Sequence, residues 1–174
     1  GFDETVYTLT VPTDRPEFVE QSFRILKDWA DGITFDPEEV AKERGVVIEE
    51  WRLGRGASAR MDDEQFPILF KGSRYAERLP IGDREILEKA TPEALRRFYR
   101  DWYRPDLMAI VAVGDFDPAK IEEQIRRHLG GLANPDKPRP REVFPVPAHP
   151  ETLFAVSTDP EATDTTVAIH WKQP

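Results

Sequence analysis

The stretch TPEALRRFYRDWYRPDLMAIVAVGDFDPAKIEEQIRRHLGG, residues 91–131, joins two amphipathic patterns of helical period through a short apolar run. Each amphipathic pattern starts with a capping residue followed by proline, Thr91 with Pro92 and Asp117 with Pro118. Residues 108–113 (MAIVAV) lie between them and have the length and apolar character of a strand that is covered on both faces. The stretch therefore predicts a helix, a strand and a second helix, which points to a mixed α and β fold.

Three other stretches alternate in the manner of strands: TVYTLTV (5–11), TLFAVST (152–158) and TTVAIHW (165–171). Apolar residues at helical spacing predict helices over 16–30 and 36–52, with helical character reaching toward residue 60, and a short helix over 83–89. This order does not suit a regularly wound parallel sheet. We therefore expect an α+β fold, a two-layer sandwich with helices packed on one face of a mainly antiparallel sheet.

The composition limits the classes of partner. The 174 residues include 24 Lys and Arg against 33 Asp and Glu, which gives a formal charge of −9. This acidic balance argues against nucleic acid as a partner, because nucleic-acid binding needs a basic face. No apolar run approaches the ~20 residues of a membrane span, and the absence of cysteine excludes disulfides and thiol nucleophiles. The proline-rich residues 132–150 predict an extended connection.

Common catalytic motifs are missing from the sequence. The three histidines, His128, His149 and His170, do not stand at a spacing that would let two of them chelate a metal from one local element. No serine lies in a GxSxG context, and no glycine-rich phosphate loop is present. The segment FDPEEVAKERGVVIEEW (35–51) is the strongest remaining candidate for chemistry.

Two carboxylates share one line of the helix predicted there. Val40, Glu43, Val47 and Glu50 fall on one stripe, so the two carboxylates stand two turns apart, or ~10.5 Å by helix rise. The apolar members indicate that this stripe faces the core, where a carboxylate is costly unless it is paired or bound to a metal. The pattern leaves two explanations for these carboxylates open. One is a metal site, and the other is solvation or ion pairing with neighbouring basic residues: Lys42, Arg44 or Arg52.

Four motifs in this order and spacing resemble the M16 metallopeptidases, the group of pitrilysin, insulysin and the mitochondrial processing peptidase: GFDETVYTLTVP, FDPEEVAKERGVVIEEW, RLPIGDREIL and TPEALRRFYRDWYRPDLMAIVAVGDF. The resemblance is strongest to bacterial periplasmic members. It implies the M16 type of α+β metallohydrolase fold and a zinc-dependent endopeptidase that hydrolyses peptides or small unfolded proteins. It also implies that Glu50 is a zinc ligand and that Glu43 orients the site. The adjacent Glu49 lies about 100° away around the helix and is the weaker choice of ligand.

The sequence departs from the family pattern in one respect, because the zinc motif His-x-x-Glu-His is absent from it. The resemblance places that motif before Gly1. We therefore expect an N-terminally truncated piece that is inactive alone and binds no Zn²⁺ tightly, since catalytic zinc sites need about three protein ligands.

The resemblance also implies partners, a location and a domain organisation. The expected partners are peptide substrates and the rest of the same polypeptide, namely the upstream zinc-motif helix and C-terminal M16-like domains. The expected location is the periplasm. The expected domains are an incomplete M16 N-terminal-type domain (1–131), the connection (132–150), and final strands or the start of the next M16 domain (151–174). The alternative function is that of a non-catalytic M16-like structural or partner-binding module.

Overall fold

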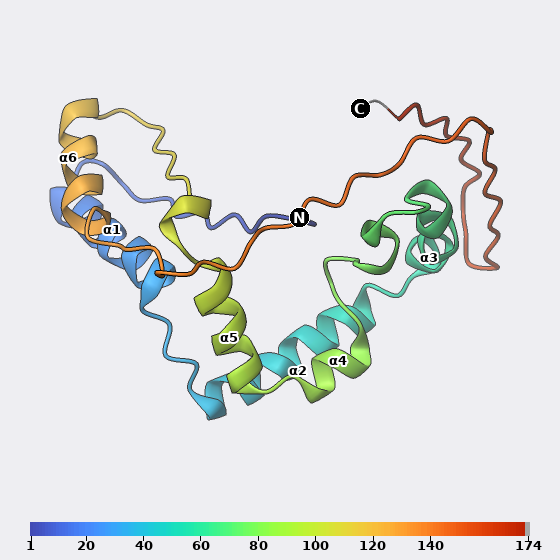
Figure 1. The fold of residues 1–174 in the computed structure, drawn as a ribbon, viewed down its shortest axis with the longest axis horizontal. Coiled ribbons are helices and arrows are strands. Elements are labelled where there is room, and N and C mark those ends of the chain that lie inside the picture. The colour runs from blue at the N-terminus through green and yellow to red at the C-terminus, as the bar shows by residue number, and fades with distance from the viewer. Residues whose placement is uncertain (173–174) are drawn as a thin grey trace. The chain divides into compact units, whose positions relative to one another are not determined.

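The computed structural model describes residues 1–172, and its regular secondary structure is helical (Figure 1). The elements in chain order are α1 (Pro16–Asp31), α2 (Pro37–Leu53), α3 (Ala57–Leu69), η1 (Arg74–Glu77), α4 (Arg84–Lys89), α5 (Pro92–Trp102), η2 (Pro105–Leu107) and α6 (Pro118–Leu129). The helices predicted over 16–30, 36–52, 83–89 and in the two amphipathic parts of 91–131 are confirmed to within a few residues. Helix α3, which contains Pro67, lies mostly beyond residue 60, where the sequence pattern predicted no helix.

The predicted sandwich is wrong, because no strand or sheet is present within residues 1–172. All four segments predicted as strands, 5–11, 108–113, 152–158 and 165–171, lack regular secondary structure. An alternating pattern favours extended backbone, but a strand exists only where its N–H and C=O groups pair with a neighbouring strand. In these segments most apolar side chains are exposed instead, for example Val113 at 91% and Val156 at 90% of their full area.

Side-chain caps mark the starts of α4, α5 and α6. The side chain of Thr91 accepts a hydrogen bond from the Ala94 N–H at 3.2 Å, and Asp83 accepts one from the Ile86 N–H at 3.1 Å. Asp117 caps α6 in a similar way. Such bonds satisfy backbone donors that have no partner inside the helix. The helices therefore follow from signals that lie within a few residues of each start.

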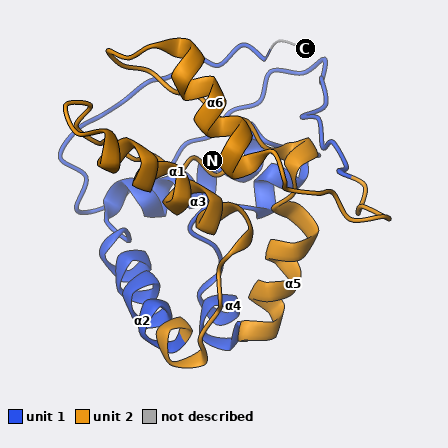
Figure 2. Cartoon of the chain, turned by 90° about the vertical axis from the view of Figure 1, so that its left-hand side faces the viewer, with its two compact units in different colours: residues 1–4, 41–90, 141–174 blue, residues 5–40, 91–140 orange. Residues whose placement is uncertain are grey.

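The chain divides into two compact units, shown in different colours in Figure 2. Unit 1 comprises residues 1–4, 41–90 and the chain from 141 onward, and unit 2 comprises residues 5–40 and 91–140. The boundary falls inside α2, and its residues from Ala41 onward belong to unit 1. The candidate site residues Glu43 and Glu50 therefore both lie in unit 1.

Unit 2 is held together by the packing of α1 on α6. Phe23 on α1 is 4% exposed, and its ring stacks on the His128 imidazole of α6 with centroids 6.2 Å apart. Beside this contact, Glu20 lies 3.0 Å from the Arg127 guanidinium and 3.2 Å from His128 Nε2. Burial alone would raise the pKa of Glu20, but hydrogen bonds from Arg24 and His128 outweigh it and lower that pKa.

Unit 1 contains an aromatic cluster around η1. The Phe2 ring lies 5.1 Å from Tyr75 and 5.6 Å from Phe70 in edge-to-face geometry. A separate ion pair ties α3 to the C-terminal segment, since Arg60 donates to both carboxylate oxygens of Asp159 at 2.7 Å. These contacts join parts of the sequence that are 68 to 99 residues apart.

The chain exposes more surface than a folded protein of its mass. Its accessible surface is 13835 Å², whereas folded domains of 20.0 kDa expose about 8,700 Å² and two separate domains of half that mass about 10,500 Å². Among the apolar side chains of residues 1–172, Phe23 alone is buried. Much of the apolar surface therefore has no cover from the described residues. None of the helices in the described part of the chain has the length and apolar character needed to cross a membrane.

Candidate functional site

Glu43 and Glu50 both lie on α2, but neither carboxylate is buried. The pattern predicted that their stripe faces the core, and Val40 and Val47 of that stripe are half-buried. The two glutamates on the same stripe are exposed, so the prediction that they point into the core is wrong within residues 1–172. Helical periodicity fixes which residues share a line, whereas the side that becomes covered depends on what packs against the helix.

The basic residues that could neutralise these carboxylates are engaged elsewhere. Arg52 donates from Nε and Nη2 to Glu49, at 2.8 and 2.6 Å. Arg44 donates to the backbone carbonyl of Ala90. Within residues 1–172 no hydrogen bond or ion pair reaches the carboxylate of Glu43 or of Glu50, so the expected pairing with Arg44 or Arg52 does not hold. Both carboxylates are exposed, which agrees with the other expectation, solvation.

Glu49 differs from the adjacent Glu50 because its carboxylate is paired with Arg52. The hydrogen bonds from Arg52 lower the pKa of Glu49, and the same pair raises the pKa of Arg52. The positive charge of the guanidinium partly neutralises this carboxylate, which makes it a weaker ligand for a metal cation than a carboxylate without such a partner. Of the two adjacent glutamates, Glu49 is therefore the one whose charge is already paired.

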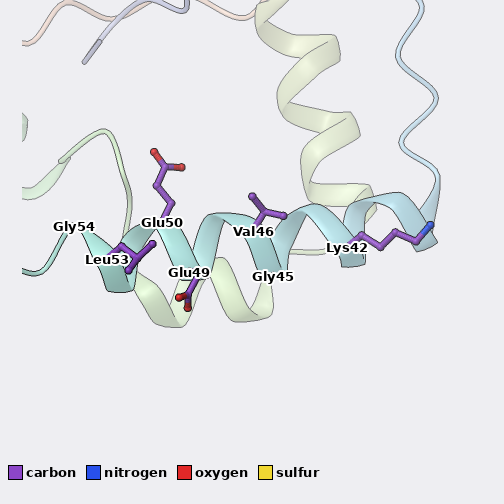
Figure 3. Close-up of a pocket in the computed structure, with 7 residues that line it drawn as sticks. All are labelled: Lys42, Gly45, Val46, Glu49, Glu50, Leu53 and Gly54. Carbon is purple, nitrogen blue, oxygen red and sulfur yellow. The ribbon is translucent and has the colours of Figure 1, made fainter.

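Glu50 lies at an open hollow on the surface of α2 (Figure 3). The hollow is lined by Lys42, Gly45, Val46, Glu49, Glu50, Leu53 and Gly54. Glu50 and Val46 point to the same side of the helix, and Glu49 points to the opposite side. Val46 is 59% exposed and Leu53 is 70% exposed, while a Cβ atom added at Gly45 would meet no other atom within 4 Å. This face of α2 thus combines an unpaired carboxylate with uncovered apolar and small residues.

The described residues do not form a complete metal site. Within residues 1–172, no three His, Cys, Asp or Glu side chains are grouped so that they could hold a metal ion. His128 lies on α6 in the α1 contact, and His149 Nδ1 lies 2.7 Å from the Glu151 carbonyl oxygen. An exposed, unpaired carboxylate has the chemistry of one oxygen donor for zinc, and a catalytic zinc site needs about three protein ligands. Glu50 has the chemistry of one such donor, and the described residues do not supply the other ligands.

The contacts that attach α2 to α4 could not be predicted from the sequence. The Arg84 guanidinium lies over the Trp51 ring, 5.7 Å from its centre, and Arg55 lies over the same ring at 5.3 Å. The Arg44 bond to Ala90 joins the same two helices. The only signal in the sequence was the seven-residue spacing of Arg44 and Trp51, which gives no information about the partner helix.

Comparison with known proteins places the chain in a family. Residues 89–174 match the family described as "Peptidase M16 inactive domain", a match that begins after Glu43 and Glu50. The chain is 40% identical to "Zinc protease PQQL-like" of Arabidopsis thaliana, with 99% of this chain and 18% of that protein covered. It is 33% identical to "Probable zinc protease PqqL" of Escherichia coli strain K12, with 100% of this chain and 19% of that protein covered.

A solved structure agrees with these relatives. The crystal structure of the first half of the periplasmic protease PqqL from Escherichia coli matches with a TM-score of 0.74 and 34% identity, over 80% of this chain and 30% of that one. The chain spans about a fifth of the length of the two curated relatives. The predicted resemblance is thus confirmed, and the chain belongs to the M16 peptidase family.

Proposed function

We propose that the intact protein containing this chain is a zinc-dependent endopeptidase, acting on peptides or small unfolded proteins, and that α2 contributes Glu50 as one zinc ligand. Two relatives that are 40% and 33% identical over essentially this whole chain are named as zinc proteases. The observation that carries the assignment is the state of Glu50. It is exposed and unpaired within residues 1–172, while the nearby Arg44 and Arg52 are held by other partners.

The role proposed for Glu43 is to orient the site rather than to bind the metal. It lies seven residues before Glu50, on the same line of α2, and is also exposed and without a partner among the described residues. A carboxylate near a metal centre aligns the groups that bind the metal through hydrogen bonds. When bound, zinc supplies a Lewis acid for the scissile carbonyl. Glu50 holds one side of that centre through its carboxylate oxygens.

The remaining ligands and the general base are proposed to come from the rest of the polypeptide. The hollow beside Glu50 supports this, because Val46 and Leu53 are exposed and Gly45 allows another helix to approach closely. Covering these residues would bury apolar area next to the unpaired carboxylate. The chain alone, with one candidate ligand, is then inactive and binds zinc weakly.

The test compares three neutral variants of the intact protein: Glu50→Gln, Glu43→Gln and the control Glu49→Gln. We expect Glu50→Gln to lose most of its zinc and its peptidase activity together. We expect Glu43→Gln to keep more zinc than Glu50→Gln does. Its affinity for zinc should fall about 10- to 100-fold relative to the wild type, the range for residues that support a ligand. Glu49→Gln should keep wild-type zinc. Full zinc occupancy in Glu50→Gln removes Glu50 from the ligand set.

The alternative is a non-catalytic module, and one observation favours it. Residues 89–174, about half of this chain, match the M16 domain that is described as inactive. Glu43 and Glu50 precede that region, so the match does not bear on their role. An intact wild-type protein with no bound zinc and no peptidase activity would support the module.

We propose a periplasmic location for the intact protein on the basis of its bacterial relative. The matching Escherichia coli structure is described as a periplasmic protease, although a plant protein is also among the relatives. Cell fractionation followed by immunoblotting tests this location, and recovery with cytoplasmic markers contradicts it.

A further inference from the structure

Helix α4 is attached to α2 at two points. At one end, the Arg44 guanidinium donates to the carbonyl of Ala90, the residue that follows α4. At the other end Arg84, the first residue of α4, lies over the Trp51 ring at 5.7 Å from its centre. Arg44 and Trp51 are about 10.5 Å apart along α2, and Arg84 and Ala90 are about 9 Å apart along α4 at the same helical rise. These two contacts place the start of α4 at the end of α2 and the end of α4 near its middle, so the short helix runs in the opposite direction to α2, as the colours of the two ribbons in Figure 1 show.

Each side chain at the Trp51 end is held by a second partner. Arg84 pairs with Glu88 at 2.8 Å, one turn further along α4. Arg55, which also lies over the Trp51 ring, pairs with Asp63 of α3 at 2.5 Å. A cation above an indole face is attracted by the charge distribution of the ring, and its position is more defined when a carboxylate holds it. Trp51 is thus in contact with α4 through Arg84, and it is linked to α3 through Arg55 and Asp63.

These attachments set the rotation of α2 about its own axis. Arg44 and Trp51 each directly follow one of the candidate site glutamates, Glu43 and Glu50. Successive residues of an α-helix are about 100° apart, so the line of glutamates lies about 100° from the line that α4 holds. In Figure 3, Glu50 points away from the pale green helix that runs below α2. When the contacts with α4 fix the side of α2 that carries Arg44 and Trp51, they also fix the side from which Glu43 and Glu50 project.

We infer that α4 is a positioning element for the candidate zinc ligand, and that the Arg84–Trp51 and Arg44–Ala90 contacts hold Glu50 in the direction that a metal site requires. This inference rests on the proposed function. Trp51, Arg84 and Arg44 are positioning residues that act through Glu50. Their loss lets α2 rotate and misplaces the carboxylate, which lowers zinc affinity without removing a ligand.

The test measures the zinc dissociation constant of the intact protein by competition with a chelator. The variants are Trp51→Leu, Trp51→Phe and Arg84→Gln, with Lys89→Gln as control because Lys89 pairs with Glu85 on its own helix. We expect Trp51→Leu to weaken zinc binding about tenfold, at the lower end for residues that support a ligand. Arg84→Gln should weaken it about two- to fivefold, as for loss of one exposed cation–π contact. Trp51→Phe should keep most of the wild-type zinc affinity, because phenylalanine retains an aromatic ring. Lys89→Gln should match the zinc affinity of the wild type within twofold.

The variant Glu50→Gln separates this inference from the proposed function. If Glu50→Gln binds zinc like the wild type, the proposed ligand is wrong and the proposed function fails. If Glu50→Gln loses zinc while Arg84→Gln and Trp51→Leu keep wild-type affinity, the positioning role alone is overturned. Arg84→Gln is the decisive variant if Trp51→Leu fails to fold, because the Arg84 side chain is 59% exposed and tolerates substitution.

Discussion

Replacement of Phe23 by alanine tests how unit 2 is held together. Phe23 is 4% exposed and stacks on His128, and it is the only buried apolar side chain among residues 1–172. Removing a buried phenylalanine costs about 3–5 kcal/mol, and the lower value suits a contact between two helices that can close up around the gap. A loss of about 3 kcal/mol corresponds to roughly a hundredfold fall in the hydrogen-exchange protection of α1 and α6.

The assay is hydrogen exchange of the intact protein followed by mass spectrometry, read on peptides from α1 and α6. Phe23→Leu should show a smaller loss than Phe23→Ala, because it keeps most of the apolar contact. Arg24→Ala is the matched control, since its side chain is 64% exposed and its ion pair with Glu20 is worth about 1 kcal/mol or less. Wild-type protection in Phe23→Ala, or an equal loss in Arg24→Ala, would show that the α1–α6 contact does not depend on this residue.

Three further outcomes are expected. Thr91→Ala removes the cap of α5 and should lower the stability of that helix by about 1 kcal/mol, seen as faster exchange at its first turn, with Thr91→Ser close to wild type. Hydrogen bonds from Arg60 lower the pKa of Asp159 from 3.8 to about 2. The stability that this pair contributes is therefore complete above pH 4 and is lost as the pH falls through 2. Asp159→Asn should remove this acid dependence from the hydrogen exchange of residues 153–161. Gly72 has a φ of +80°, and a Cβ atom there would stand 2.8 Å from Pro147 Cγ. Gly72→Ala should therefore destabilise unit 1 by about 1–2 kcal/mol in a thermal unfolding assay. An unchanged unfolding midpoint would show that this position does not require glycine.

The helices could be predicted because their signals are local. Thr91 with Pro92 and Asp117 with Pro118 mark helix starts through bonds that span two or three residues. Helix α3 was missed because its apolar residues lack a clear helical period and Pro67 interrupts the pattern. The predicted sheet was wrong because strand pairing, unlike helix capping, does not depend on local signals. Residues such as Val111 and Val156 favour extended backbone locally, but pairing depends on distant partners that the pattern cannot supply.

The candidate site was predictable in part. Helical spacing placed Glu43 and Glu50 on one line of α2, and of the adjacent glutamates Glu49 is the one whose charge is already paired. Burial of that line was predicted wrongly, because the contacts with α4 are made by the neighbouring line, Arg44 and Trp51. The ligand role of Glu50, the orienting role of Glu43 and the domain boundaries predicted at 131 and 150 remain predictions.

The central claim is that α2 supplies a zinc ligand at Glu50, and a crystal structure of the zinc-loaded intact protein tests it most directly. An anomalous difference map at the zinc absorption edge locates the metal without reference to the assumed ligands. The account predicts one zinc ion with a Glu50 carboxylate oxygen at about 2.0–2.2 Å. A zinc ion whose protein ligands include no atom of α2, with Glu50 still in solvent, would contradict it.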